Sequence, residues 1–271
     1  MALPRILILA FVTVASIGTT NADELRVATF NVNYANRRGD LVLRAIATAN
    51  ADVICLQETT LQSEEFLRRH LKVEYPEFNV IGHQDRYYAE RFAFVSRQPP
   101  KDLDFHPPKD GLFGFWCATF TTAQRDIRIV NVHLKPFMLN RDSGVTGIMA
   151  SVAATEACHQ NEIARIIQSL PDDMPVLVVG DFNSMSTFCA PQAMASAGYM
   201  DSFASVHDKP DAHPTWHWPT RPIPLRMRVD YIFHSVEFQT LTSQVIAPTG
   251  SDHSLLVSEL KISEGKGHPR G

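Results

Sequence analysis

The chain has 271 residues, a formal net charge of −4 and a sequence pI near 6.2. Its hydrophobic fraction of 45% and charged fraction of 20% are those of an ordinary globular protein. The slightly acidic balance argues against tight non-specific binding of nucleic acid, which requires a basic field, although a local basic patch remains compatible with it.

The first 22 residues have the pattern of a secretory signal. Arg5 gives a positive start, Ile6–Ile17 is apolar, and small residues follow at Thr20-Asn21-Ala22. This apolar run is shorter than the roughly 20 residues that span a bilayer, which favours a cleaved signal over a membrane anchor, and no later segment is long and apolar enough to span. We therefore expect a secreted or periplasmic protein with one domain over residues 23–263 and a disordered tail over 264–271.

Short strand-like runs then alternate with amphipathic helical segments. Helices are predicted at Gly39–Asn50, Ser63–Leu71, Ala153–Leu170 and Pro191–Ala197, and strands at Leu25–Asn31, Ala51–Glu58, Phe92–Ser96, Phe113–Thr121, Asp126–His133, Val176–Gly180, Val229–Phe233 and Leu255–Leu260. The proline-rich stretches Gln98–Asp110 and His207–Pro224 are predicted to be loops. Because the glycine-rich phosphate loops of doubly wound folds do not occur, the alternation favours an α/β fold in which two sheets stack with helices outside.

Six of the strand-like runs end at, or carry, a polar residue suited to metal or phosphate chemistry. These residues are Asn31, Glu58, His133, Asp181 with Asn183, Asp230, and Asp252 with His253. One such residue would mean little, since turns are polar, but six suggest side chains gathered at one rim of a sheet. The pattern therefore indicates an enzyme.

Glu58, Asn31 and Asp252 are the candidate metal ligands. A carboxylate at the tip of an apolar strand is costly unless it is paired or bound to a cation. Oxygen donors of this kind suit Mg²⁺. Taken alone, Glu58 is better explained as an exposed strand end, and only the further oxygen donors Asn31 and Asp252 favour a hard-metal site.

His253 is the candidate base, because an imidazole can accept a proton when a carboxylate fixes its tautomer. Asp230, embedded in an apolar strand, is the candidate partner; the alternative for it is a salt bridge with Arg226 or Arg228. His133 offers a second imidazole for the oxygens of a substrate, or is an ordinary strand-end histidine.

Asp181 and Asn183 follow a fully apolar strand in Gly180-Asp181-Phe182-Asn183. Two residues apart, their side chains can face the same way. The alternative is an Asx turn, which aspartate and asparagine favour.

Together the motifs resemble the endonuclease/exonuclease/phosphatase superfamily, which includes DNase I, AP endonucleases, neutral sphingomyelinases and inositol-polyphosphate 5-phosphatases. The segments that carry the resemblance are Thr29-Phe30-Asn31-Val32, Leu56-Gln57-Glu58, Asn131-Val132-His133-Leu134, Gly180-Asp181-Phe182-Asn183, Arg228-Val229-Asp230-Tyr231-Ile232-Phe233 and Ser251-Asp252-His253. The resemblance implies a four-layer α/β/β/α sandwich of two mixed sheets, and hydrolysis of a phosphoester that depends on Mg²⁺, with Mn²⁺ as an alternative.

The resemblance also implies a role for each site residue. Glu58 holds the metal, with Asn31 and Asp252 near it. Asp181 and Asn183 orient the attacking water and the phosphoryl oxygens. His253, buttressed by Asp230, is a base or phosphate ligand, and His133 stabilises developing charge or assists the leaving group. Whether Asp181 or His253 takes the proton of the water stays open.

Two departures from the AP endonuclease pattern narrow the choice among the branches of this superfamily. Asn33 stands where AP endonucleases carry a second acidic residue, and His133-Leu134 replaces their tyrosine-bearing segment. Both point away from abasic-site repair, and the His-Leu pattern is nearer to the DNase I, sphingomyelinase and phosphatase branches. Because no long exposed apolar hairpin suited to membrane insertion is evident, a nuclease-like phosphodiesterase is favoured. The alternatives are a sphingomyelinase-like phospholipid headgroup hydrolase, a phosphomonoesterase, and a catalytically silent binding module on the same fold.

Other segments bear on the substrate. Trp216 and Trp218 could stack on a base, lie against a lipid headgroup or cap the core. The run Gly111–Trp116 is a partial candidate for a membrane-inserting hairpin, and Arg86 and Arg91 are candidate phosphate contacts.

Export permits disulfides. Cys55 and Cys117 lie in apolar runs and are expected to be buried thiols, whereas Cys158 and Cys189 are the favoured pair if one bridge forms. No C-x-x-C pair occurs, which argues against a structural zinc site. We expect a monomer.

Overall fold

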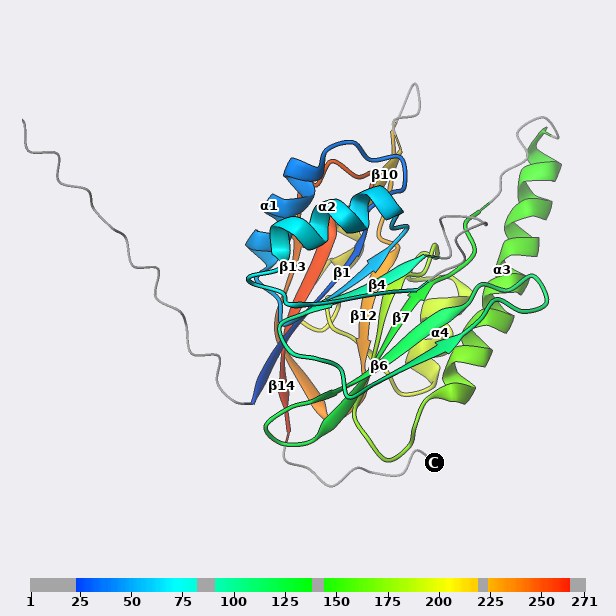
Figure 1. Ribbon diagram of the computed structural model, residues 1–271. Helices are drawn as coiled ribbons and strands as arrows, with labels where there is room; N and C mark the ends of the chain where they lie inside the picture. Colours follow the sequence, from blue (N-terminus) through cyan, green and yellow to red (C-terminus); the bar gives the residue numbers. More distant parts are fainter. Residues whose placement is uncertain (1–22, 82–90, 138–143, 219–223, 264–271) are drawn as a thin grey trace, which may run out of the picture.

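The computed structural model describes residues 23–81, 91–137, 144–218 and 224–263 (Figure 1). The signal segment predicted at residues 1–22 and the tail predicted at 264–271 lie outside the described residues. Two six-stranded mixed sheets lie face to face, and helices cover the outer side of each. The four-layer α/β/β/α sandwich is therefore confirmed.

The first sheet has the strand order β13-β14-β1-β2-β4-β3, and the second has the order β5-β6-β7-β8-β12-β9. The strands are β1 Glu24–Asn31, β2 Val53–Gln57, β3 Glu77–Ile81, β4 Phe92–Ser96, β5 Asp102–His106, β6 Phe115–Thr121, β7 Asp126–His133, β8 Val176–Asp181, β9 Met200–Asp201, β12 Asp230–His234, β13 Phe238–Ile246 and β14 Leu255–Ile262. A separate antiparallel ribbon pairs β10, Trp216–Trp218, with β11, Leu225–Met227, and follows the 3-10 helix η3, Pro210–Ala212.

Four α-helices form the outer layers: α1 Gly39–Ala49 and α2 Leu61–Leu71 over the first sheet, α3 Gly144–Ser169 and α4 Cys189–Ser196 over the second. The apolar stripe of α1 explains its position, because Val42, Ala45, Ile46 and Ala49 are the residues it buries. A capping box starts α2: the Thr60 side chain accepts from Ser63 N at 3.1 Å, and Ser63 Oγ accepts from Thr60 N at 2.8 Å.

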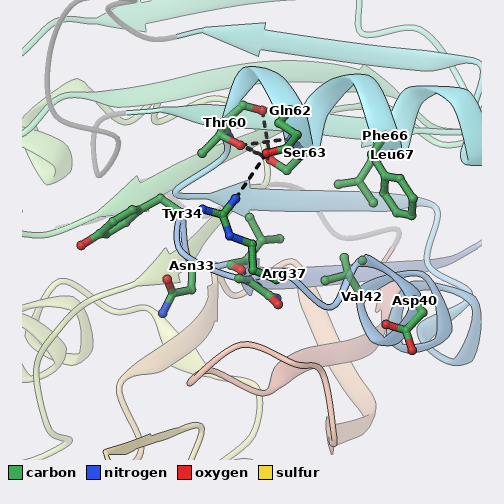
Figure 2. A pocket seen from close by; sticks show the side chains of 13 residues that line it. Asn33, Tyr34, Arg37, Asp40, Val42, Thr60, Gln62, Ser63, Phe66 and Leu67 are labelled. Atoms are coloured by element: carbon green, nitrogen blue, oxygen red, sulfur yellow. Dashed lines mark hydrogen bonds between the residues drawn. The ribbon is translucent and has the colours of Figure 1, made fainter.

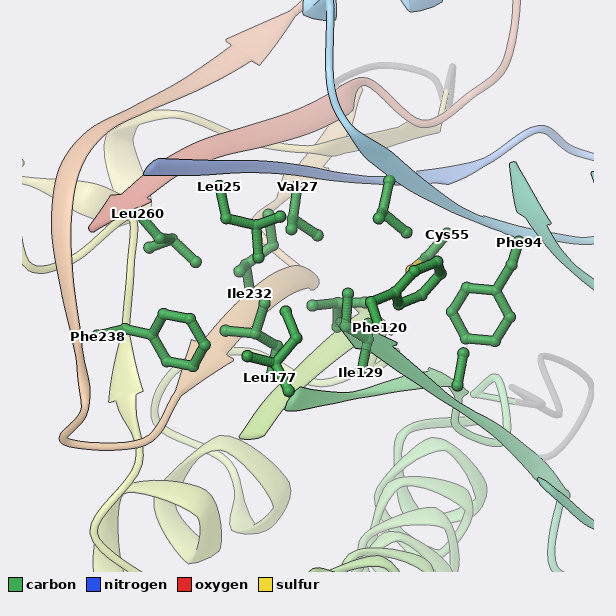
Figure 3. Close-up of a cluster of buried hydrophobic side chains, with 14 of the residues drawn as sticks. Leu25, Val27, Cys55, Phe94, Phe120, Ile129, Leu177, Ile232, Phe238 and Leu260 are labelled. Carbon is green, nitrogen blue, oxygen red and sulfur yellow. The ribbon is translucent and has the colours of Figure 1, made fainter. Parts of the chain in front are cut away.

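The central strands are buried on both faces, which is why they read as continuous apolar runs. On β8, Leu177 and Val179 point into the core between the two sheets, and Val176 and Val178 pack under α3. Figure 3 shows the core between the sheets, where side chains such as Val27 and Ile129 come from opposite layers.

The strands that the sequence did not predict lie mostly at sheet edges. β5 falls inside Gln98–Asp110, which was wrongly predicted to be a loop, and β13 was not predicted at all. Both are edge strands with largely exposed, polar side chains, so they lack the apolar pattern of a buried strand. The stretch His207–Pro224 was also predicted to be a loop, but its described part contains η3 and β10.

No helix in the described part of the chain combines the length and the apolar character needed to cross a membrane.

Candidate active site

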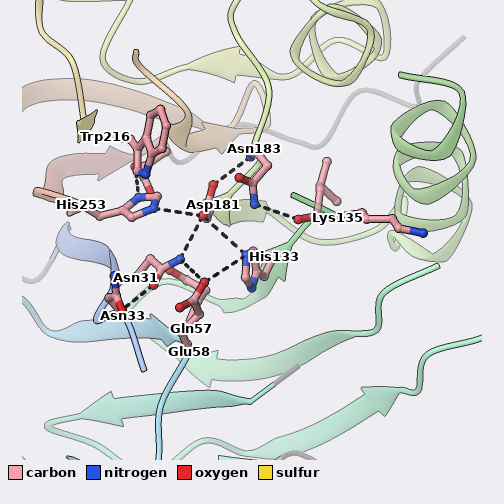
Figure 4. Close-up of polar contacts among 12 residues, drawn as sticks. Asn31, Asn33, Gln57, Glu58, His133, Lys135, Asp181, Asn183, Trp216 and His253 are labelled. Carbon is pink, nitrogen blue, oxygen red and sulfur yellow. Dashed lines mark hydrogen bonds and ion pairs between the residues drawn. The ribbon is translucent and has the colours of Figure 1, made fainter. Parts of the chain in front are cut away.

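Strand register brings the predicted polar residues to one rim. β1 and β2 run parallel with Asn31 opposite Gln57, so Asn31 and Glu58 leave the first sheet side by side. β7 and β8 run parallel with His133 opposite Asp181, and the antiparallel strand β12 places Asp230 opposite Asp181 on its other side. The carboxyl ends of these parallel strands and the start of β12 therefore form one polar rim (Figure 4).

The tightest group at this rim joins His253 to two aspartates. His253 Nδ1 lies 2.9 Å from Asp230 Oδ2, and its Nε2 lies 3.5 Å from Asp181 Oδ2. All three side chains are buried, and each offers one possible metal-ligand atom that lies within 4.8 Å of the other two. The salt bridge between Asp230 and Arg228, considered as an alternative, does not form, because Arg228 binds Asp201 and Asp211 instead.

The surrounding charges keep His253 protonated. Burial opposes the charged imidazolium, but the negative charges of Asp230 and Asp181 outweigh it and raise the pKa of His253 to about 10. Burial also raises the pKa of Asp230, against the attraction of His253. Because the carboxylates of both Asp230 and Asp181 face the ring, we place the proton on the imidazole, which then donates from Nδ1 to Asp230 Oδ2 at 2.9 Å.

His133 occupies the middle of the rim. Its Nε2 lies 3.6 Å from Asp181 Oδ2 and 3.8 Å from Glu58 Oε1, so it faces carboxylates of both sheets. The ring of Phe113 packs edge-on against it, with the ring centroids 5.8 Å apart. The imidazole is therefore held between the two halves of the site.

Amide groups link the other carboxylates. Asn31 Nδ2 donates to Glu58 Oε1 at 3.1 Å and to Asp181 Oδ2 at 3.0 Å. Asn33 Nδ2 donates to Asp252 Oδ1 at 2.6 Å, while its own backbone N–H donates to Asn31 Oδ1. Asp252 is thus joined to the predicted ligands Glu58 and Asn31 through Asn33.

The Asx turn considered for Asp181 and Asn183 is present and does not compete with the site. Asp181 Oδ1 accepts from Asn183 N at 2.8 Å, while Asp181 Oδ2 faces the two imidazoles. The Asn183 side chain donates to Leu134 O at 2.9 Å, which ties it to the segment that follows His133.

Unusual backbone conformations occur at this rim. Asn33, Glu58 and Asn183 have φ values of 56°, 55° and 46°, in the left-handed region that non-glycine residues seldom adopt. Gly180 has a φ of 149°, and a Cβ there would lie 1.9 Å from Val132 O, so only glycine lets β8 approach β7 just before Asp181. Strain of this kind persists where the surrounding structure fixes a functional geometry.

The donor set fits a divalent cation. Glu58, Asp181 and Asp230 face two imidazoles, Asp252 is bound by Asn33 and Trp216, and no lysine or arginine in the described ranges pairs with any of these four carboxylates. Glu58 Oε1 and Asp181 Oδ2 converge on the same Asn31 amide, which leaves an excess of hard oxygen donors with negative charge. Glu58 and Asn31 would hold Mg²⁺ or Mn²⁺, with Asp252 near them. The side-chain oxygens of all three accept hydrogen bonds, from Asn31, Tyr34, Asn33 and Trp216, which orient these oxygens at the rim.

Other expectations are corrected. Arg91 is no phosphate contact, because it is buried and its Nη2 lies 2.6 Å from Glu64 Oε1. The membrane-hairpin candidate fails because Phe115 and Trp116 are buried within β6. Arg86 lies outside the described residues.

The cysteines follow the expectation in part. Cys55 and Cys117 are buried thiols, as expected. The Cys158–Cys189 bridge is absent, since all four cysteines are free and Cys189 Sγ donates to Glu156 O at 3.2 Å.

Residues without an assigned role also support the rim. Gln57 Nε2 donates to Asn131 Oδ1 at 2.7 Å, a buried amide bridge between the two sheets directly beneath the site. Glu162 on α3 accepts from Phe113 N and Lys135 N, which fixes the segments on either side of His133. A polar residue inside an apolar strand was the available signal for Gln57 and Asn131, whereas no local signal marks Glu162.

Comparison with known protein families gives one match over most of the chain. The model described as "Endonuclease/Exonuclease/phosphatase family" matches residues 28–253. No curated protein sequence gives a significant match to the chain.

Several solved structures share the fold. The endonuclease/exonuclease/phosphatase from Beutenbergia cavernae DSM 12333 is 17% identical, with a TM-score of 0.68 over 89% of this chain and 72% of that one. D. rerio TDP2, complexed with a single-strand DNA product, is 18% identical, with a TM-score of 0.69 over 88% of this chain and 99% of that one. The human Nocturnin catalytic domain, with a bound sulfate anion, is 17% identical, with a TM-score of 0.65 over 89% of this chain and 95% of that one. The TM-scores show that these proteins share a fold with this chain, and at identities this low the likeness shows the fold alone.

Proposed function

Since the chain belongs to the endonuclease/exonuclease/phosphatase family, we propose that it is an exported, metal-dependent phosphodiesterase that acts on nucleic acid. The observation that carries the proposal is the placement of Asp181 Oδ2 3.5 Å from His253 Nε2 and 3.6 Å from His133 Nε2, with Glu58 beside them. Phosphoryl transfer needs this combination of a proton acceptor, fixed cationic donors and a cation site.

Each residue has a task that follows from its contacts. Asp181, oriented by the Asn183 backbone N–H and the Asn31 amide, is the group placed to accept the proton of the attacking water. His253, held by Asp230, donates from Nε2 to a phosphoryl oxygen, and His133 donates to the developing charge on the phosphate or the leaving oxygen. Glu58 and Asn31 would hold a divalent cation, which would supply charge neutralisation and Lewis acidity at the phosphoryl group.

The preference for nucleic acid rests on exposed aromatic side chains beside the site. Tyr34, whose backbone N–H donates to Glu58 Oε2, is 51% exposed, and Trp218 on β10 is 45% exposed. Exposed rings can stack on bases of a single strand. The relative complexed with single-strand DNA product has the same fold. The burial of Phe115 and Trp116 removes the membrane-inserting hairpin that a lipid substrate would have used.

The test uses the purified mature protein with bis-p-nitrophenyl phosphate and with single-stranded DNA. Turnover should require Mg²⁺ or Mn²⁺ and should stop with EDTA. His253→Ala should lower kcat by roughly 10³-fold while the circular-dichroism spectrum of the folded protein is retained, because a charge-stabilising donor is lost. His70→Ala, an exposed histidine on α2, is the matched control and should keep wild-type rates.

Two results would overturn the proposal: wild-type turnover by His253→Ala, or a kcat/KM for sphingomyelin vesicles or inositol phosphates far above that for DNA. Export is tested separately. The mass of the protein recovered from the periplasm or medium should correspond to removal of about 22 residues, as expected for a cleaved signal.

A further inference from the structure

A pocket of about 380 Å³ lies beside the rim, between the segment that joins β1 to α1 and the start of α2 (Figure 2). Two of its lining residues also contact the site: Tyr34 N donates to Glu58 Oε2 at 3.3 Å, and Asn33 Nδ2 donates to Asp252 Oδ1 at 2.6 Å. The pocket and the rim therefore adjoin and share residues.

The pocket has an apolar interior and a polar outer edge. Val42 and Leu67 are buried and Phe66 is half-buried, whereas Arg37 and Gln62 are exposed. Figure 2 shows Arg37 reaching from the α1 side towards the start of α2, where its Nη1 lies 3.3 Å from Gln62 Oε1. Within the described residues this is the one hydrogen bond of either side chain, so Gln62 Nε2 and the other guanidinium N–H groups are available to a ligand.

The pocket has too few cations to bind a phosphate group. Asp40 lines it and is bound by the neighbouring Arg38 at 3.0 Å, so Arg37 is the one unpaired cation that the described residues place at its edge. A phosphate or inositol phosphate subsite would require several cations. An apolar interior with a few neutral donors and acceptors suits a planar heterocycle instead.

We propose that this pocket is a nucleobase subsite, which takes the base next to the scissile phosphate and makes the enzyme selective for nucleotide diesters. The proposal rests on the proposed function and deepens it by naming what the enzyme recognises apart from the phosphate. The base lies on the apolar wall of Phe66 and Leu67, and Gln62 and Arg37 contact its polar edge.

The test compares diesters that share one leaving group. Thymidine 5′-(p-nitrophenyl phosphate) and thymidine 3′-(p-nitrophenyl phosphate) carry a base on either side, and methyl p-nitrophenyl phosphate carries none. The wild-type protein should have a KM at least about tenfold lower for one of the thymidine esters than for the methyl ester, the scale expected for stacking of one base. The double variant Arg37→Ala/Gln62→Ala should lose most of that advantage and retain its kcat/KM for the methyl ester.

A second variant changes the wall without touching a polar group. In Gly39→Ala the new Cβ would lie 2.5 Å from Phe66 Cε1, so the ring must move from its place in the pocket wall. This variant should also raise KM for the preferred thymidine ester and leave KM for the methyl ester unchanged. Arg44→Ala, an exposed arginine on α1 outside the pocket, is the matched control and should behave as wild type.

The outcomes separate the two proposals. If none of the three esters is hydrolysed with Mg²⁺ or Mn²⁺, the proposed function fails. If the methyl ester is hydrolysed as efficiently as both thymidine esters, or if the pocket variants affect all esters equally, the nucleobase subsite is wrong and the proposed function stands.

Discussion

The two halves of the candidate site are organised differently. The imidazole half, Asp181, Asp230 and His253, is buried and connected by direct contacts of 2.9 and 3.5 Å. The carboxylate half, Glu58 and Asp252, is less buried, and its acids are connected through the amides of Asn31 and Asn33.

The difference shows which half is complete by itself. In the imidazole half the protonated ring of His253 lies directly against the carboxylates of Asp230 and Asp181, so its geometry is fixed by the fold. In the carboxylate half only amide dipoles stand between the acids, and amides cannot neutralise charge. A bound cation would complete that half. The two halves should therefore respond differently to mutation and to metal.

Among the variants that separate the two halves, the largest effect is expected from breaking the imidazole half at Asp230→Asn. Without this carboxylate nothing holds a proton at Nδ1 of His253 or fixes the orientation of its ring, so kcat should fall about 10²- to 10³-fold at saturating metal. It also removes a negative charge that raises the pKa of His253, so an NMR titration without metal should give a value below about 10.

Asp172→Asn, at the exposed turn before β8, is the matched control for that change. A kcat within twofold of wild type for Asp230→Asn would show that the imidazole half does not depend on its buried acid.

Glu58→Gln should act on the other half and through the metal. A neutral amide is a weaker ligand for a hard cation, so the Mg²⁺ concentration that gives half-maximal rate should rise at least about tenfold. The contact between His253 and Asp230 should be unaffected. Glu65→Gln, an exposed glutamate on α2, is the control, and an unchanged metal requirement for Glu58→Gln would place the cation elsewhere.

The smallest effect on turnover is expected beneath the rim, where the Gln57–Asn131 bridge joins the sheets that carry the two halves. Gln57→Leu or Asn131→Leu leaves a buried amide without its partner, which should lower the free energy of unfolding by about 1–3 kcal/mol. In the double variant both amides are gone, and the loss should be smaller than the sum of the two. Urea denaturation measures the free energy of unfolding of the two single variants and of the double variant. Strictly additive losses would mean that the two amides do not stabilise each other.

Local sequence patterns predicted most of the core elements. Runs such as Val176–Gly180 and the apolar stripe of α1 were found because burial on two faces, or on one helical face, leaves a local signature. The residues that gather at the rim were also named from the chain, since each ends a strand or begins one. The roles assigned to them stay predictions.

Tertiary structure alone decided what those residues touch. Pairing between distant strands sets Asp230 beside His253, and it places Asn33 between Asp252 and the predicted ligands. Only the tertiary structure shows the edge strands β5 and β13 and the pocket beside Tyr34. Polar edge strands and cavities produce no periodic pattern of apolar residues in the sequence. The chain by itself determined which groups are available for chemistry. Their distances depend on strand register and on how the two sheets pack, which are set by contacts between residues far apart along the chain.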